Sequence, residues 1–303
     1  MRILVTGARG FIGAAIVRRA LSCGQEVVAL DTAAGKRELP AEVEFILGDI
    51  NAPVDWASKL RGVDALIHTA AIHRVDEVMV NPVKAISVNL HGTRAVLNAA
   101  AKAGVGRFVY LSTAKVYGVS LGFRSEESEL PTPLEPYGLS KALSEQYCRV
   151  YQESTGMRCV SIRPFSVYGP GQDLDTGYIG QLIQSLRDNS PAVLSGTPEH
   201  IRDFVYIEDV VQLCMAAATR DLTFDVINAG SGRATSLSDL VKMFQKSAGR
   251  AIMVRYKEPS PGTIARSLAA IERMSLTLSS QPTNLADGLA QTLSWFLGDS
   301  GVA

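Results

Sequence analysis

Short apolar runs alternate with helical patterns through the first half of the chain. Several of the runs are almost continuously apolar, which is typical of strands that are buried on both faces. Strands that alternate with helices in this way form a parallel sheet with helices on both sides. The predicted strands are Ile3 to Thr6, Glu26 to Leu30, Val43 to Leu47, Ala65 to Thr69, Arg107 to Ser112 and Cys159 to Arg163.

Helices are expected between these strands, because apolar residues recur there at helical spacing. Two of the predicted helices end next to a glycine, Gly104 or Gly156, which suits the left-handed residue that commonly follows a helix. The predicted helices are Phe11 to Cys23, Asn89 to Lys102 and Tyr137 to Thr155.

The pattern becomes irregular after Arg163. Glycines interrupt it, one amphipathic helix fits Ile179 to Asp188, and no internal repeat is visible. We therefore predict an α/β fold with a Rossmann-type doubly wound parallel sheet in residues 1–165. A smaller mixed α/β substrate-binding lobe is predicted in residues 166–303, with segments around 202–230 packing back on the Rossmann domain.

The composition narrows the choice of partner and location. The 303 residues are 47% hydrophobic, which allows a substantial core. The 30 basic and 30 acidic residues form no charge runs, so we expect a small-molecule partner rather than nucleic acid or a membrane. Scattered cysteines favour buried thiols in a reducing compartment and no metal. A strand begins at once and no apolar stretch approaches a membrane span, so the predicted location is cytoplasmic.

A glycine pattern, G-x-x-G-x-x-G, follows the first predicted strand at Gly7, Gly10 and Gly13 and opens the first helix. Residues without a Cβ let the backbone turn tightly and approach a pyrophosphate, and the helix N-terminus offers N–H groups and a positive dipole to it. An ordinary glycine turn is the alternative. Here, however, strand, turn and helix occur in the order of a dinucleotide-binding site.

Asp31 ends the second predicted strand, where an acidic side chain bonds the adenosine ribose in dinucleotide-binding folds. A carboxylate there repels the 2′-phosphate of NADP, so NAD is the predicted cofactor. Lys36 and Arg37 follow closely and are interpreted as solvated loop charges, with phosphate binding as the alternative. Further residues expected near the cofactor are Asp49, Ala70 and Ala71.

Tyr137 and Lys141 stand four residues apart on a predicted helix and therefore on one face. Such pairs are common by chance, but this one follows a nucleotide-binding pattern, and Thr113 follows the preceding strand. Moving a hydride to or from a carbinol requires a proton acceptor, and a tyrosine with a pKa of about 10 is a poor one at neutral pH. A lysine ammonium about 4 Å away contributes on the order of 4 kcal/mol, enough to lower that pKa by roughly three units. We expect Thr113 to bond the same substrate oxygen.

A series of segments over nearly the whole chain carries a family resemblance: TGARGFIG at Thr6 to Gly13, GDI at Gly48 to Ile50, IHTAA at Ile67 to Ala71, NLHGT at Asn89 to Thr93, LSTAKVYG at Leu111 to Gly118, PYGLSK at Pro136 to Lys141, RPFSVYGPG at Arg163 to Gly171 and RDFVYIEDV at Arg202 to Val210. The chain resembles the extended short-chain dehydrogenase/reductases, or NAD-dependent epimerase/dehydratase family. The resemblance implies NAD, most often a nucleotide-diphosphate sugar as substrate, and a homodimer formed by the helices that follow Asn89 and contain Tyr137.

The resemblance also implies roles for individual residues. The implied catalytic residues are Thr113, Tyr137 and Lys141. Arg202 resembles an arginine that grips a substrate phosphate, and Lys115 and Ser166 occupy substrate-facing positions. For His73, a loop histidine without a role is the alternative to a cofactor contact. The residues implied at the cofactor are Gly7, Arg9, Gly10, Phe11, Ile12, Gly13, Asp31, Asp49, Ile50, Ala70, Ala71, His73, Asn89, Tyr137, Lys141, Pro164 and Val167.

Some positions depart from the family pattern. Sugar-nucleotide enzymes of this kind usually carry asparagine at Ser166, often an arginine near Ser260 and frequently an aspartate near Ala270. These departures weaken the match to the usual pyrophosphate site. dTDP-glucose 4,6-dehydratases place an Asp-Glu pair directly after the threonine, where this chain has Ala114 and Lys115. Elimination of water by that route is therefore not expected.

The leading interpretation is an NAD-dependent epimerase or 4-keto-sugar reductase that acts on a carbinol of a nucleotide-diphosphate sugar by tyrosine-assisted hydride transfer. The first alternative is an NAD-dependent dehydrogenase of a non-nucleotide sugar or sugar acid, which releases NADH. The second alternative is a non-catalytic NAD(P)-sensing protein of the same fold. The complete Thr-Tyr-Lys set argues against that alternative.

Overall fold

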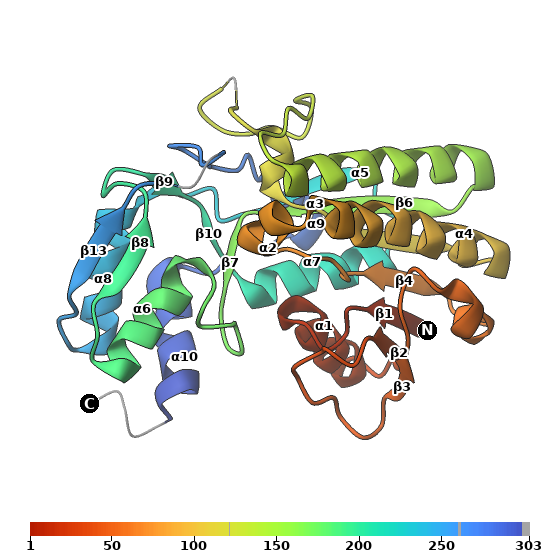
Figure 1. Ribbon diagram of the computed structural model, residues 1–303. Coiled ribbons are helices and arrows are strands. Elements are labelled where there is room, and N and C mark those ends of the chain that lie inside the picture. The colour runs from red at the N-terminus through yellow and green to blue at the C-terminus, as the bar shows by residue number, and fades with distance from the viewer. Residues whose placement is uncertain (121, 260–261, 299–303) are drawn as a thin grey trace. The chain divides into compact units, whose positions relative to one another are not determined.

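The computed structural model describes residues 1–120, 122–259 and 262–298. Its largest sheet has the strand order β11-β6-β5-β4-β1-β2-β3, of which β6, β4, β1, β2 and β3 are labelled in Figure 1. Six of these strands are the predicted ones, each within one residue at either end, and β11 was not predicted. The strands are β1 (Arg2–Thr6), β2 (Glu26–Asp31), β3 (Glu44–Leu47), β4 (Ala65–His68), β5 (Arg107–Leu111), β6 (Arg158–Pro164) and β11 (Val226–Ala229).

The strand order reverses at β1. This strand pairs in parallel with β2 on one side and with β4 on the other, so that Thr6 stands in register with Leu30 and with His68. In doubly wound sheets, ligands bind outside the carboxyl ends of the strands at such a reversal. The predicted Rossmann-type α/β fold is confirmed, and the loops after β1, β2 and β4 are the place to look for a dinucleotide site.

Helices follow the strands as the pattern predicted. The three predicted helices correspond to α1 (Phe11–Ser22), α4 (Thr93–Ala103) and α5 (Pro136–Thr155). Gly104 and Gly156 each take a left-handed φ of 75° at the ends of α4 and α5. One start differs from the prediction, because Ser87–Gly92 form a π-helical segment, η3, ahead of α4. The other short elements are η1 (Pro53–Asp55), η2 (Ala57–Leu60), α2 (Val75–Val80), α3 (Pro82–Ile86) and η4 (Ala114–Tyr117), and the longer α7 is Ile207–Thr219.

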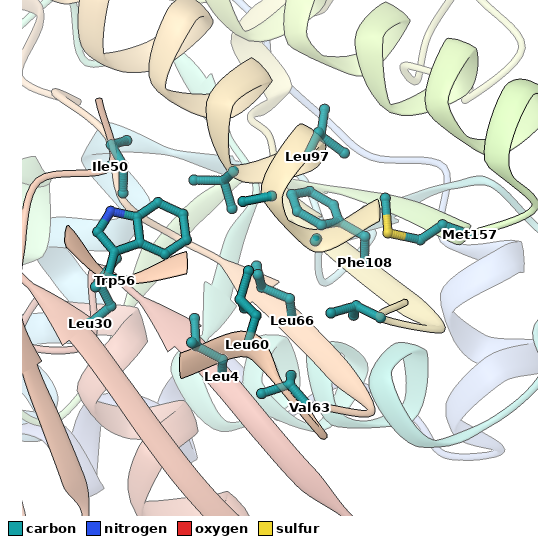
Figure 2. Close-up of a cluster of buried hydrophobic side chains, with 14 of the residues drawn as sticks. Leu4, Leu30, Ile50, Trp56, Leu60, Val63, Leu66, Leu97, Phe108 and Met157 are labelled. Carbon is teal, nitrogen blue, oxygen red and sulfur yellow. The ribbon is translucent and has the colours of Figure 1, made fainter. Parts of the chain in front are cut away.

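A cluster of buried apolar side chains joins the sheet to α4. It includes Leu4, Leu30, Trp56, Leu66, Leu97 and Phe108 (Figure 2). Each such side chain contributes roughly 1.5–3 kcal/mol on full burial. The alternate residues of β1, Ile3 and Val5, are also fully buried. The strand is therefore covered on both faces, as its continuous apolar run predicted.

The chain divides into two compact units. The first comprises Met1–Tyr117, Leu130–Arg163 and Val211–Ile227, and the second comprises Gly118–Glu129, Pro164–Val210 and the chain from Asn228 onward. The second unit pairs β7 with β10 and β8 with β13 in parallel, and β9 with β12 antiparallel. The predicted domain boundary after residue 165 stays a prediction.

The second unit is mixed in structure, and its first helix agrees with the one predicted there. Its elements are β7 (Ser166–Tyr168), α6 (Gly177–Asp188), β8 (Ala192–Ser195), β9 (Ile201–Arg202), β10 (Phe204–Tyr206), β12 (Thr235–Ser236), α8 (Leu237–Ala248), β13 (Val254–Lys257), α9 (Glu272–Leu278) and α10 (Leu285–Leu297).

The cysteines agree with the sequence-based expectation except at one position. Cys148, Cys159 and Cys214 are buried free thiols, whereas Cys23 is exposed. The expectation of a buried thiol is wrong at Cys23 because this residue follows the last turn of α1 and lies off its buried face. Within the described part of the chain, none of the helices combines the length and apolar character needed to cross a membrane.

Candidate active site

The turn after β1 packs closely against the loop after β4. Gly7 has a left-handed φ of 66°, and a Cβ there would lie 2.6 Å from the backbone nitrogen of Ala70. A Cβ at Gly13 would overlap the carbonyl oxygen of Gly7. The Thr69 hydroxyl donates to the Thr6 carbonyl at 2.7 Å and links the two loops. Side chains larger than hydrogen at positions 7 and 13 would therefore force this turn open.

The start of α1 is suited to an anion. Its N-cap, Gly10, supplies no side-chain hydrogen bond, and the first turn contains no acidic residue. The helix dipole therefore acts on whatever lies in front of it, which fits a pyrophosphate. Asp31 lies beside this turn, because its Oδ2 accepts from the Arg9 N–H at 2.7 Å. A carboxylate has further lone pairs, so Asp31 can also accept from ribose hydroxyls.

The loop after β2 folds back onto the same turn. Arg9 Nε donates to the Arg37 carbonyl at 2.9 Å, and the Arg37 guanidinium lies 5.7 Å from the ring centre of Phe11. Lys36 is exposed. The interpretation of this loop as solvated charge therefore fits Lys36, whereas Arg37 packs on a residue predicted to contact the cofactor.

Asn89 connects three parts of the first unit. Its side chain accepts from the Ile72 N–H at 2.8 Å and donates to the Ile72 carbonyl at 2.9 Å and to Ser140 Oγ at 3.2 Å. Its carbonyl accepts from Thr93 at 2.6 Å and from Ser144 at 2.9 Å. Asn89 thus holds the loop after β4 against α5, and its predicted contact with the cofactor stays a prediction.

The other predicted cofactor residues of the first unit differ in exposure. Asp49 is exposed and accepts from the Asn51 N–H at 2.9 Å. Ile50 is buried, and a Cβ at Gly92 would lie 2.6 Å from its side chain, so that the loop after β3 packs on η3. His73 is exposed. Because Asp49 and His73 are exposed, both side chains are accessible to a cofactor, and their predicted contacts with it stay predictions.

The predicted catalytic residues lie together in the first unit. Tyr137 is in the first turn of α5, where the Thr113 side chain is close enough to lower its pKa. Lys141 lies one turn further on, where its Nζ donates to the Leu111 carbonyl at 2.6 Å and lies 4.6 Å from the ring centre of Tyr110. Tyr137, Lys141 and Thr113 are all buried. The spacing of four residues therefore places the tyrosine and the lysine on the inner face of α5.

The electrostatic expectation for Tyr137 is not met by the protein groups alone. Burial raises the pKa of Tyr137, the Glu135 charge raises it further, and the hydrogen bond with Thr113 lowers it. Burial also lowers the pKa of Lys141 to about 7, against the opposing effects of Cys148 and Glu145. The prediction that Lys141 by itself lowers the pKa of Tyr137 was wrong because it took no account of desolvation.

One group at the start of α5, Glu135, escaped the sequence analysis. Glu135 is the N-cap, and its carboxylate accepts from the Gly138 N–H at 2.8 Å and the Tyr137 N–H at 3.1 Å. Lys115, a predicted substrate residue, lies in η4 with its Nζ 3.9 Å from Glu135 Oε1. A residue directly before Pro136 occupies the position where a cap is expected, which is the signal that could have identified Glu135.

A buried ion pair also escaped the sequence analysis. Glu145 and Arg163 form two side-chain hydrogen bonds, and each side chain is 4% exposed. Glu145 stands four residues after Lys141, so the helical spacing that linked Tyr137 to Lys141 continues by one more turn. That spacing was the available signal, and its Arg163 partner comes from β6.

The predicted substrate residues of the second unit lie on short strands. Ser166 begins β7, and its N–H donates to the Asp203 carbonyl at 2.9 Å. Arg202 ends β9 and is buried. Its guanidinium donates to the Ile201 carbonyl at 2.7 Å and lies 5.7 Å from the ring centre of Tyr178. Binding of a substrate phosphate by Arg202 stays a prediction.

The roles expected for the remaining positions of the second unit stay predictions. Pro164 ends β6 and Val167 is the middle residue of β7. Ala270 is buried, and its N–H donates to the Ser125 carbonyl at 3.0 Å, so this position serves the local backbone. Ser260 lies outside the described residues.

Comparison with known proteins identifies the family. The profile of the NAD dependent epimerase/dehydratase family matches residues 3–230. A dTDP-glucose 4,6-dehydratase of Streptomyces griseus is 33% identical, over 97% of this chain and 93% of that protein.

Solved structures agree over almost the full length. A UDP-glucose 4-epimerase of Thermotoga maritima, solved with UDP-glucose, has a TM-score of 0.93 at 28% identity and covers 99% of both chains. A UDP-glucuronic acid 4-epimerase of Bacillus cereus, in complex with UDP-glucuronic acid and NAD, has a TM-score of 0.89 at 30% identity, over 98% of this chain and 99% of that one.

Proposed function

Because this chain belongs to the NAD dependent epimerase/dehydratase family, we propose that it is an epimerase that inverts a carbinol carbon of a nucleotide-diphosphate sugar. Two similar solved structures are 4-epimerases that contain UDP-sugars, and one of them also contains NAD. The observation that carries the proposal is the burial of Tyr137, Lys141 and Thr113 together, with Lys141 Nζ held at the Leu111 carbonyl two residues before Thr113.

These three side chains suit proton transfer at a sugar hydroxyl. Tyr137 is the proton acceptor, and Thr113, whose side chain lowers the pKa of Tyr137, can bond the same substrate oxygen. Thr113 orients that oxygen and stabilises the charge that develops on it. Lys141 is held by the Leu111 carbonyl and supplies a positive charge close to Tyr137 when protonated.

NAD is the cofactor that the first unit fits. The glycine turn, the uncapped start of α1 and the Asp31 carboxylate would hold its pyrophosphate and its adenosine ribose. When bound, NAD supplies the reversible acceptor of hydride. Because burial raises the pKa of Tyr137, its ionisation needs a positive charge beyond those of the protein groups, which an oxidised nicotinamide ring would supply.

Water elimination does not suit this site. Position 114 is a buried alanine, and Lys115 is paired with Glu135. The Glu135 carboxylate is itself occupied by two backbone N–H groups at the start of α5. No carboxylate therefore directly follows Thr113, and we propose epimerisation rather than the dehydration named for the Streptomyces relative.

Ser166 and Ala270 favour one second candidate. Both depart from the usual pyrophosphate-binding pattern, which keeps an NAD-dependent dehydrogenase of a sugar acid as the alternative. For the epimerase we propose Arg202 as the phosphate ligand, with Lys115 and Ser166 toward the sugar. Arg202 is buried and held at two carbonyls, so its guanidinium is oriented in advance.

We also propose a homodimer. The outward face of α5 exposes Leu139, Leu143, Tyr147 and Val150, each by at least 36%. This spacing makes a continuous apolar stripe along the helix. α3 packs against α5 and exposes Val83. A second copy of the chain is the occupant we propose for this face, and the free cysteines favour a cytoplasmic location.

A substrate screen tests the proposed function. Purified protein with NAD is incubated separately with UDP-glucose, UDP-glucuronic acid, dTDP-glucose and free glucuronic acid, and products and NADH are measured. We expect one nucleotide sugar to be isomerised without net NADH. Steady NADH production from the free sugar acid, with no isomerisation of any nucleotide sugar, would establish the second candidate.

A further inference from the structure

Glu145 makes three hydrogen bonds inside the first unit. Its carboxylate accepts from Arg163 Nε at 2.9 Å and Nη2 at 2.6 Å, and from Ser112 Oγ at 2.5 Å. All three residues are buried. The carboxylate therefore connects α5 to the end of β6 and to the residue immediately before Thr113.

Stability alone does not explain such a pair. Removing two charges from water costs about as much as their attraction returns, so buried ion pairs are seldom more stable than apolar residues of the same size. Burial acts to lower the pKa of the Arg163 guanidinium, whereas Glu145, with a contribution from Tyr117, raises it, and the net effect is a raised pKa. Glu145 and Arg163 therefore form an ion pair. The residues around Glu145 indicate what its negative charge does.

Lys141 is the neighbour one turn away on the same face of α5. Burial lowers its pKa to about 7, and Cys148 and Glu145 act in the opposite direction. Cys148 is a thiol whose own pKa is raised by burial, so it is uncharged at neutral pH. Glu145 is then the group that favours the ammonium form of Lys141.

Apart from Arg163, the other titratable groups around Lys141 carry no charge at neutral pH. Burial lowers the pKa of His68 in β4 to about 3 and raises the pKa of Tyr110 in β5 and of Tyr137 in α5. Arg163 in β6 is charged and is bonded to Glu145, whereas Glu145, one turn from Lys141 on α5, is the member of the pair that raises the pKa of Lys141. The protonation of Lys141 therefore depends on Glu145 more than on any other of these groups.

We propose that Glu145, anchored by Arg163, is a positioning residue for hydride transfer that keeps Lys141 protonated and fixes Ser112, and with it Thr113. The proposal rests on the proposed function, in which Thr113 and Lys141 act together with Tyr137. It adds a residue that acts through Lys141 and Ser112 and lies one turn beyond Lys141 on α5.

The direct test is the titration of the Lys141 side chain. Nζ resonances of ¹⁵N-lysine-labelled full-length protein with NAD are followed against pH, and Lys141→Met identifies the signal of interest. In Glu145→Gln we expect the pKa of Lys141 to fall by about one unit, because the negative charge that favours its ammonium form is lost. This shift is a tenfold loss of proton affinity. An unchanged titration in a folded variant overturns the proposal.

If Glu145→Gln unfolds because the Arg163 charge is left buried without its partner, two further variants keep the test decisive. Glu145→Gln combined with Arg163→Met removes both charges and is expected to fold and to show the same lowered titration. Ser112→Ala leaves no buried charge without its partner. It should lower kcat severalfold while the Kd for NAD stays constant. Wild-type titration in the double variant, or wild-type kcat in Ser112→Ala, counts against the proposal.

Kinetics separate this inference from the proposed function. With a nucleotide sugar that is isomerised, Glu145→Gln should lower kcat about tenfold at neutral pH and shift the alkaline limb of its pH profile downward, so that lower pH partly restores the rate. Val63→Ala, a buried apolar control in the same unit, should lower the Tm and leave that limb unchanged. Wild-type turnover in Tyr137→Phe and Lys141→Met would refute the proposed function, whereas an unaltered limb in Glu145→Gln would refute only the positioning role.

Discussion

Helices α1 and α5 both belong to the first unit, but they are built in opposite ways. α1 buries apolar residues such as Ile16 and Val17 and leaves Arg18 and Arg19 exposed. On one face of α5 a set of polar residues is buried, and on another an apolar stripe is exposed; the buried set includes Tyr137, Ser140, Lys141, Ser144, Glu145 and Cys148, and the stripe is Leu139, Leu143, Tyr147 and Val150. An ordinary surface helix has the arrangement of α1.

The buried polar face and the exposed apolar face of α5 suit different roles. Buried polar groups are costly unless they are hydrogen-bonded, and those of α5 are satisfied: Ser144 bonds the Asn89 carbonyl, Lys141 the Leu111 carbonyl and Glu145 the Arg163 guanidinium. The inner face of α5 therefore suits chemistry and its outer face suits a partner chain, whereas α1 serves to hold the glycine turn at its own N-terminus.

The largest expected effect comes from the inner face of α5. Tyr137→Phe should lower kcat by roughly 10³-fold, because only the proton-transfer group is lost, while the Kd for NAD stays within a few-fold. Steady-state kinetics and calorimetric titration measure the two quantities. Tyr147→Phe is the matched control, with the same change on the same helix but on the outer face, and it should retain wild-type kcat. Equal loss in both variants would contradict the division of the two faces.

The outer face should respond through oligomeric state instead. Leu143→Lys places a charge in the apolar stripe and should raise the dimer dissociation constant by about 100-fold, close to 3 kcal/mol. Sedimentation equilibrium measures this constant. Gln146→Lys introduces the same charge at an exposed position of α5 outside the stripe and should leave the dimer intact. A wild-type protein that is monomeric at all concentrations would contradict the proposed dimer.

His68 extends the buried polar network from α5 to the sheet. It is fully buried between Thr6, at 2.6 Å, and Thr93, at 2.9 Å, and burial with the nearby Lys141 lowers its pKa from 6.5 to about 3. The unfolded chain binds this proton below about pH 6.5 and the folded chain does not, so this contribution is present above pH 6.5 and is lost as the pH falls toward 3. We expect His68→Gln to flatten the acid side of the stability profile by up to about 1.4 kcal/mol per pH unit. Urea unfolding at several pH values measures this slope, and equal slopes in both proteins would show that His68 is protonated in the folded state.

The smallest expected effect is at Asp31, which ends β2 and lies beside the turn before α1. Asp31→Ala should weaken NADH binding by about tenfold, because one or two charge-assisted hydrogen bonds to the ribose are lost. It should also reduce the preference for NADH over NADPH. Fluorescence titration of both cofactors measures these changes. Tighter binding of NADPH than of NADH by the wild-type protein would contradict the role assigned to Asp31.

The fold and the common helix face of Tyr137 and Lys141 could be predicted from sequence because their signals are local, and the catalytic role of these residues stays a prediction. Strand runs, the glycine turn and the four-residue spacing of Tyr137 and Lys141 depend on neighbours in the chain. The Glu145–Arg163 pair could not be predicted, since it joins a helix to a later strand and either residue alone reads as a surface charge. The pKa of Tyr137 was misjudged for a related reason, because the sequence does not show how deeply a helix face is buried.

The fate of the hydride tests the central claim most directly. The protein, with bound NAD and an excess of free unlabelled NAD, is given UDP-glucose deuterated at C4, and the products are analysed by mass spectrometry and NMR. The account predicts an isomerised nucleotide sugar that keeps its deuterium at C4, with no label in free NADH, and loss of this reaction in Tyr137→Phe but not in Tyr147→Phe. Deuterium that accumulates in free NADH, with an oxidised sugar as the product, would contradict the account and identify a dehydrogenase.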